Sequence, residues 1–126
     1  MENDSKLVLA LKAARAMIEN EAHWAQGEAA VDLYGYPTHA TSETAHRRCL
    51  GSAVVCAVSR IERGSRERNV LRANVNAAIV HAPSFPTWMN DEDDCPVIRA
   101  NDWKSTTHRD VLSWIDEAIH THGGTE

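Results

Sequence analysis

A thiol and an imidazole in this sequence stand where they could form a catalytic pair. Cys49 lies close to the start of a strongly apolar stretch, and His108 lies at the expected start of another helix. A thiol at the amino end of a helix lies near the positive end of the dipole, which lowers its pKa, and an imidazole can take its proton. If the protein is an enzyme, we expect Cys49 as nucleophile and His108 as base. The residues that would orient the imidazole or assist at an oxyanion are Asp102, Asn101 and Gln26.

A structural role for the same residues is the stronger interpretation. A buried cysteine behaves as a small hydrophobe, and a histidine in a first helical turn is commonly a polar surface residue. Asn and Asp are frequent in turns and helix caps because their side chains bond to the neighbouring backbone. We therefore favour a protein that is not an enzyme and uses no cofactor.

The spacing of possible metal ligands does not predict a metal site. Cys49 and Cys56 lie seven residues apart on one expected helix, hence about 10 Å along its axis, whereas two thiolates on one zinc ion lie about 4 Å apart. His46 could join Cys49, but there is no second ligand pair such as Cys-x-x-Cys. The sequence also contains no glycine-rich phosphate loop, no Gly-x-Ser-x-Gly and no His-Glu-x-x-His.

An acidic run close to a tryptophan predicts a protein-binding surface. The aromatic residue is Trp88, and the acidic run consists of Asp91, Glu92, Asp93 and Asp94. Such a run attracts a basic partner, and tryptophan is a frequent anchor in protein interfaces. The other candidate anchor is Trp24. We expect a non-enzymatic protein-binding module whose partner is another protein.

The middle of the chain offers nucleic-acid contact as a further alternative. Residues 43–72 contain seven arginines and three glutamates, although the chain as a whole carries a net charge of −5. The arginines from Arg60 to Arg72 are interleaved with acidic residues, which is more typical of a solvated face than of a nucleic-acid surface.

Length and composition fit one soluble globular domain over residues 1–126. The chain is 43% hydrophobic and 25% charged, which is typical of a folded protein. Three cysteines are an odd number, and no segment resembles a secretory leader or a membrane span. We therefore expect a cytoplasmic protein with free thiols and no membrane contact.

Apolar periodicity predicts a mainly α fold with about four principal helices. They cover approximately residues 5–21, 45–61, 65–81 and 108–122. The helix at 45–61 is apolar on almost every face, so we expect the others to pack around it. Inside it, Gly51 predicts the close approach of another backbone. Thr107 and Asp110 have the spacing of a capping box at the start of the last helix.

Two connections complete the expected fold. Glycine and proline beside two tyrosines, at 34–37, predict a turn and a small β-hairpin near residues 28–39. Residues 82–97 hold prolines and the acidic run without an apolar repeat, so we expect an acidic connection on the surface, with one turn of helix after Asp94.

Four motifs follow one another along the chain. They are His23-Trp24-Ala25-Gln26-Gly27, Arg48-Cys49-Leu50-Gly51-Ser52-Ala53, Asn101-Asp102 and Thr107-His108-Arg109-Asp110-Val111-Leu112. Together, with a turn at Gly35, they resemble a family of small bacterial and phage proteins of unknown function. The resemblance covers about residues 14–119, and it implies a phage or mobile-element origin but no activity, cofactor or substrate. The acidic stretch 84–96 and the arginine-rich turn near Arg63 depart from that pattern, which makes them candidates for a partner surface particular to this protein.

Overall fold

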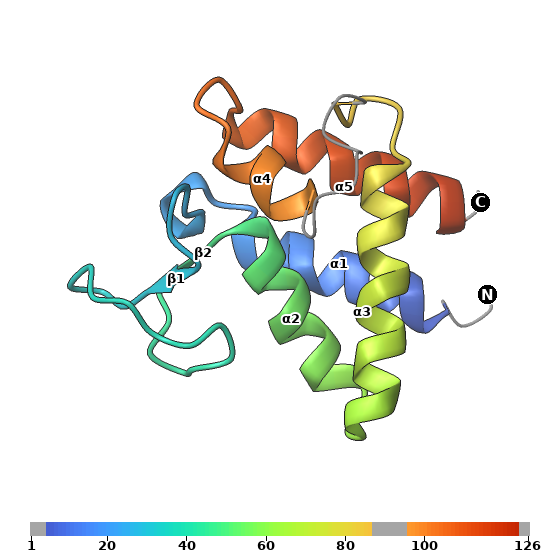
Figure 1. Cartoon of the computed structure of the whole chain (residues 1–126), viewed down its shortest axis with the longest axis horizontal. Helices are drawn as coiled ribbons and strands as arrows, with labels where there is room; N and C mark the ends of the chain where they lie inside the picture. The colour runs from blue at the N-terminus through green and yellow to red at the C-terminus, as the bar shows by residue number, and fades with distance from the viewer. Residues whose placement is uncertain (1–4, 87–95, 124–126) are drawn as a thin grey trace.

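The computed structural model describes residues 5–86 and 96–123, and these residues form a mainly α-helical protein (Figure 1). Its elements are α1 (Lys6–Ile18), the 3-10 turn η1 (Glu21–His23), β1 (Ala30–Val31), β2 (Arg47–Arg48), α2 (Leu50–Ile61), α3 (Ser65–Val80), α4 (Pro96–Asp102) and α5 (His108–Gly123). The expected helical class is confirmed, with five helices in the described residues where about four were expected.

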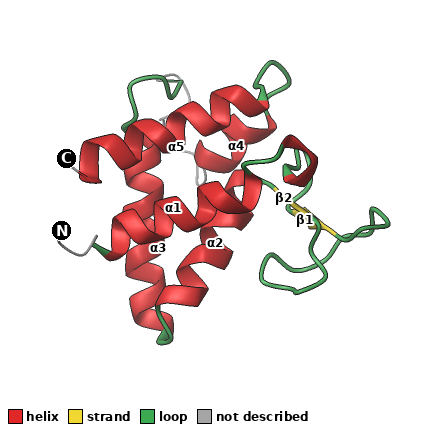
Figure 2. Cartoon of the chain, turned by 180° about the vertical axis from the view of Figure 1, so that it is seen from behind, coloured by secondary structure: helices red, strands yellow, loops and turns green. Residues whose placement is uncertain are grey.

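The helices form two layers around one core (Figure 2). Helices α1 and α5 run side by side, and α2 and α3 pack against them from the other side. The largest side chains with no exposed surface come from four helices: Leu11, Ile18, Leu50, Ile79 and Ile115. Helix α1 contacts α2, α3 and α5, so it shares the central position that we expected for the second helix alone.

Helix α1 is capped by Ser5 and ends earlier than expected. The hydroxyl of Ser5 accepts a hydrogen bond from the backbone N–H of Val8, which satisfies one of the free donors of the first turn. The helix ends at Ile18, because Asn20 caps a separate 3-10 turn through the N–H of Ala22. On its outer face, Arg15 donates a hydrogen bond to the carboxylate of Asp116 on α5, which raises the pKa of Arg15.

The expected start of the second helix at residue 45 is wrong. Arg47 and Arg48 are extended and pair with β1, and α2 starts only at Leu50. Cys49 is the N-cap, where its sulfur accepts a hydrogen bond from the N–H of Ser52 at 3.3 Å. Pairing with a strand far earlier in the chain overrides the helical pattern of these residues.

The predicted hairpin within residues 28–39 is wrong in its second strand, because β1 pairs with β2 at Arg47–Arg48. The two strands are antiparallel, with Ala30 opposite Arg48 and Val31 opposite Arg47. Within residues 28–39 the strand contact is one isolated bridge between Val31 and Pro37. The hairpin is therefore wide, and the chain between its two strands extends away from the helices (Figure 1).

The capping box at the start of α5 is confirmed. The N–H of Thr107 donates to Asp110 Oδ2 at 2.9 Å, and the N–H of Asp110 donates to Thr107 Oγ1 at 3.1 Å. The close approach expected at Gly51 is also present, since a Cβ there would lie 2.8 Å from Cγ1 of Ile98. A side chain of α4, rather than a backbone, uses this space.

The first part of the connection at 82–97 is not a surface excursion. Ala82 and Phe85 are buried, and the ring of Phe85 packs edge-on against Trp114 with 5.0 Å between centroids. The indole N–H of Trp114 donates to the carbonyl of Ser84, and Glu117 accepts from the N–H of Ser84. These contacts attach the turn after α3 to α5. At the other end of the connection, α4 is longer than the single turn expected.

None of the described helices combines the length and the apolar content needed to cross a membrane.

Candidate functional site

Asn101 joins three segments that are far apart in the sequence. Its side chain is fully buried, and Oδ1 accepts from the indole N–H of Trp24 at 2.7 Å and from the N–H of Leu50 at 3.0 Å. Its amide nitrogen donates to the carbonyl of Ala25 at 3.1 Å and to Asp102 Oδ1 at 2.8 Å. All the hydrogen-bonding capacity of this amide is therefore used inside the protein.

Gln26 caps the carboxyl end of α4. Its amide nitrogen donates to the carbonyls of Asn101, Trp103 and Thr106 at 3.1, 2.8 and 3.2 Å. The last carbonyls of a helix have no partner within the helix, so a side-chain donor from another segment satisfies them. Gln26 thus holds α4 and the loop after it against the residues that follow η1.

Gly27 completes the same contact. Its backbone has a φ of +85°, a region that favours glycine, and its N–H donates to Asp102 Oδ1 at 2.9 Å. Asp102 therefore accepts from both Gly27 and Asn101, and its carboxylate holds backbone in place.

His108 is attached to the end of α1. Its Nε2 lies 2.6 Å from the carbonyl oxygen of Ile18, and its ring lies 5.7 Å from that of Trp24. A carbonyl only accepts, so Nε2 carries the proton of this hydrogen bond. In the neutral ring, only Nδ1 is left as a basic atom.

Cys49 is near the network but does not pair with His108. It is 3% exposed, and the polar atoms around its sulfur are the N–H and the hydroxyl of Ser52. A pocket of about 160 Å³ is bordered by Cys49 and Asp102, and His108 is not part of its lining. Of the expected catalytic residues, the structure brings together Gln26, Asn101 and Asp102, and places His108 beside Trp24. The observed contacts connect the residues after η1, the start of α2 and the end of α4.

The second feature is the loop region between the two strands, residues 32–46, which we call the arm. It projects from the helical body in both views (Figures 1 and 2). Three large side chains near its tip are mostly exposed: Leu33 at 67%, Tyr34 at 81% and Tyr36 at 68%.

The backbone of the arm tip is fixed by Asp32. Its Oδ1 accepts from the N–H groups of Tyr34 and Tyr36 at 2.9 and 3.0 Å, and its own N–H donates to the carbonyl of Tyr36 at 2.9 Å. Gly35 adopts a φ of +88°, and its N–H donates to the carbonyl of Asp32. The exposed aromatic side chains therefore stand on an ordered turn.

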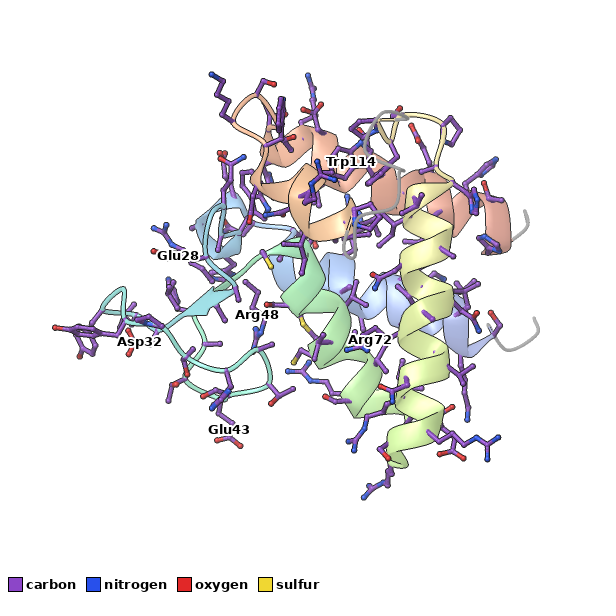
Figure 3. All side chains as sticks on the ribbon, in the orientation of Figure 1. Glu28, Asp32, Glu43, Arg48, Arg72 and Trp114 are labelled. Atoms are coloured by element: carbon purple, nitrogen blue, oxygen red, sulfur yellow. The ribbon has the colours of Figure 1, made fainter. Side chains whose placement is uncertain are left out.

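Arg48 fixes the other loop of the arm. From β2, its guanidinium donates to the carbonyls of Ala40 at 2.7 Å and Ser42 at 3.1 Å. Figure 3 shows Arg48 at the base of the arm, with Asp32 and Glu43 farther out.

The glycine and proline at 34–37 predict a turn, but they do not indicate that its side chains are exposed. The sequence signal for this ordered turn is Asp32, two residues before Tyr34, because aspartate side chains bond to the backbone of turns. No apolar strand follows the turn directly, so no partner strand covers its side chains.

Of the arginines from Arg60 to Arg72, Arg60 lies on α2 and Arg63 precedes α3, and the three on α3 divide between two faces of that helix. Arg66 borders a pocket beside Lys6 and Glu62, whereas Arg68 and Arg72 border a pocket on the side of α2. They do not form one basic stripe.

The expected binding residues Trp88, Asp91, Glu92, Asp93 and Asp94 lie outside the described residues. Within the described part, no group of three or more His, Cys, Asp or Glu side chains is placed to hold a metal ion.

Comparison with known proteins gives a family without a known activity. A family model whose description is that of a family of unknown function matches residues 3–121. No curated protein and no solved structure matches the chain.

Proposed function

The chain belongs to the family of unknown function DUF6197, and we propose that this protein is a non-enzymatic protein-binding module whose arm enters a pocket of its partner. The observation that carries the proposal is the exposure of Leu33, Tyr34 and Tyr36, at 67–81%, on a turn whose backbone is fixed by Asp32.

Exposed aromatic side chains on a fixed turn suit a binding surface for two reasons. Tyrosine is among the residues that dominate binding energy in protein interfaces. A turn that is already ordered also loses little conformational entropy on binding. Nothing in the packing of the helices needs these side chains, since the described core cluster does not include them.

The charge of the arm favours a basic partner. Residues 32–46 contain Asp32 and Glu43 and no lysine or arginine. Two carboxylates in the arm, with no cation beside them in its sequence, repel nucleic-acid phosphates and anionic lipid headgroups. The partner that fits is a protein with an apolar pocket and a basic rim.

The geometry lends less support to the two alternatives. For a cysteine-dependent hydrolase or transferase, Cys49 would need a base, but His108 donates to Ile18 and lies away from the pocket at Cys49. For nucleic-acid contact, the arginines from Arg60 to Arg72 would need to share a face, whereas Arg66 borders a different pocket from Arg68 and Arg72.

The finer parts of the proposal rest on the sequence. A cytoplasmic location is proposed from the odd number of cysteines, and a phage or mobile-element origin from the resemblance of its motifs. The acidic surface at Trp88 stays a separate prediction, testable with Trp88→Ala and charge reversal at 91–94.

A pair of photo-crosslinking variants tests the arm. A benzophenone-bearing phenylalanine replaces Tyr34 in one variant and Val70 in the other, since Val70 is also apolar and 56% exposed but lies on α3. We expect one protein to be captured from source cells at position 34 and not at position 70.

Affinity measurement with the isolated partner completes the test. Replacing all three tip side chains, Leu33→Ser with Tyr34→Ser and Tyr36→Ser, should weaken binding at least about 100-fold, the loss of a hot spot of about 2–3 kcal/mol. Val70→Ser should leave the affinity unchanged, and Glu43→Lys should slow association at low salt. Equal affinity of the triple variant and the wild type would show that the arm is not the binding surface.

A further inference from the structure

A groove runs between α2, α3 and α4, and Thr41 of the arm borders one end of it. Its largest part is a pocket of about 410 Å³, and a second part of about 220 Å³ adjoins it through Val55 and Arg72, which border both. The larger part has the size of sites that hold small molecules, about 300–1,000 Å³. We call this feature the groove and define it by Val55, Arg68, Arg72, Ala73, Asn76 and Ile98.

The floor of the groove is apolar and its α3 wall is basic. Val55, Ala73 and Ile98 border it, while Arg68 and Arg72 lie one helical turn apart on α3. Figure 3 shows Arg72 between α2 and α3. The lining of these two pockets includes no Asp or Glu.

These two arginines have no protein partner in the described structure. Elsewhere, Lys6 pairs with Glu62 at 2.9 Å and Arg15 with Asp116. No hydrogen bond or ion pair is formed by Arg68 or Arg72 in the described residues. A guanidinium pair without a carboxylate, beside an apolar floor, suits a carboxylate or a phosphate, to which arginine can donate two parallel hydrogen bonds.

Asn76 supplies a second, independent observation. It borders the groove one turn beyond Arg72, and its Oδ1 is buried without a hydrogen-bond partner among the described residues. A buried acceptor without a donor is unfavourable, and native proteins keep few of them. A ligand hydroxyl or amine could supply the missing donor after a rotation of the Asn76 side chain.

We propose that the groove binds a small organic anion. Its apolar part lies on Val55 and Ile98, and its carboxylate or phosphate head lies between Arg68 and Arg72. This site does not depend on the proposed function of the arm, and it uses none of the three tip side chains.

Four probes separate the apolar from the anionic part of the interaction. Phenyl phosphate and phenylacetate carry both parts, phenol carries only the ring, and inorganic phosphate carries only the charge. Each is titrated into the ¹⁵N-labelled full chain while the amide signals are followed by NMR. We expect an anionic aromatic probe to shift the signals of Val55, Arg72 and Asn76, and to bind at least about tenfold more tightly than phenol or inorganic phosphate. Whichever of the two aromatic probes binds more tightly identifies the head group.

Three variants locate the site. Arg72→Gln should weaken the aromatic anion about tenfold, and Ala73→Trp, at an exposed position, should fill the groove and abolish binding. Arg66→Gln is the matched control, because it removes the same charge from the other face of α3. The triple tip variant should bind the probes like the wild type, so failure of this proposal and failure of the arm proposal are distinguishable.

Several results would overturn the proposal. The proposal is wrong if neither aromatic anion shifts the signals of the groove residues at millimolar concentration. It is also wrong if inorganic phosphate and phenyl phosphate bind with equal affinity. Equal losses from Arg66→Gln and Arg72→Gln would show that the interaction is only with diffuse positive charge. Binding of a short oligonucleotide that depends on Arg63 and Arg66 as much as on Arg72 would replace the groove by a nucleic-acid surface.

Discussion

At the residue scale, Asn101 shows how a polar side chain can be essential without taking part in chemistry. Its four hydrogen bonds hold Trp24, Ala25, Leu50 and Asp102 from one buried position. An aliphatic residue would leave the indole, one N–H and one carbonyl without partners. Asn101 thus connects Trp24, the start of α2 and the end of α4.

The first prediction concerns the stability that this network provides. Asn101→Ala should lower the free energy of unfolding by about 3 kcal/mol or more, because each buried group left without a partner costs about 1–3 kcal/mol. Urea unfolding followed by circular dichroism measures the change. Asp102→Asn is the control and should cost less, because its Oδ1 can still accept from Gly27. A loss below about 1 kcal/mol for Asn101→Ala would contradict the structural role of the network.

The second prediction has the opposite sign. Asn76→Leu should raise the free energy of unfolding by about 1 kcal/mol, because it removes a buried acceptor that has no donor. Asn74→Leu, at an exposed position on the same helix, should change it by less than about 0.5 kcal/mol. Destabilisation by Asn76→Leu would mean that the amide is needed for folding. Stabilisation combined with weaker binding of the aromatic anions would show a residue kept for its function.

At the element scale, the arm depends on one glycine. Gly35 has a φ of +88°, so a side chain there costs about 1–3 kcal/mol of local strain. Gly35→Ala should therefore lower the hydrogen-exchange protection of the Tyr34 and Tyr36 amides about tenfold or more, while the amides of α1 and α2 keep theirs. Thr41→Ala, on the other loop of the arm and without a positive φ, is the control. If protection falls equally in the arm and the helices, the arm is not an independent unit.

Elements whose signals are local were predictable from the sequence, and elements that depend on distant pairing were not. Thr107 and Asp110 satisfy each other three residues apart, so the start of α5 was predicted correctly. Arg47 and Arg48 fit the helical pattern that follows them, but they pair as a strand with Val31 and Ala30, which no local pattern indicates. The same reason explains the late start of α2.

At the scale of the whole molecule, the residues of the candidate site could be predicted from the sequence, but their contacts could not. The motif residues Trp24, Gln26, Asn101 and His108 were recognised as a set, and the structure brings them together. Their carbonyl and amide partners come from backbone atoms, whose positions depend on the packing of all five helices. The exposure of Tyr34 and the burial of Phe85 depend on that packing too, since both are aromatic residues beside a turn.

The last prediction follows from the difference in burial between Phe85 and Tyr34. Phe85 is 2% exposed and packs on Trp114, so Phe85→Ala should lower the free energy of unfolding by about 3–5 kcal/mol. Tyr34→Ser removes a ring that is 81% exposed and should change the free energy of unfolding by less than about 0.5 kcal/mol.

Since the buried side chains form one cluster, both variants and the wild type should unfold in a single transition with coincident fluorescence and circular dichroism curves. A second transition in Phe85→Ala would show that the turn after α3 and the helices are separate cooperative units. A large loss from Tyr34→Ser would mean that the tip stabilises the fold, which would remove the main reason for assigning it to a partner.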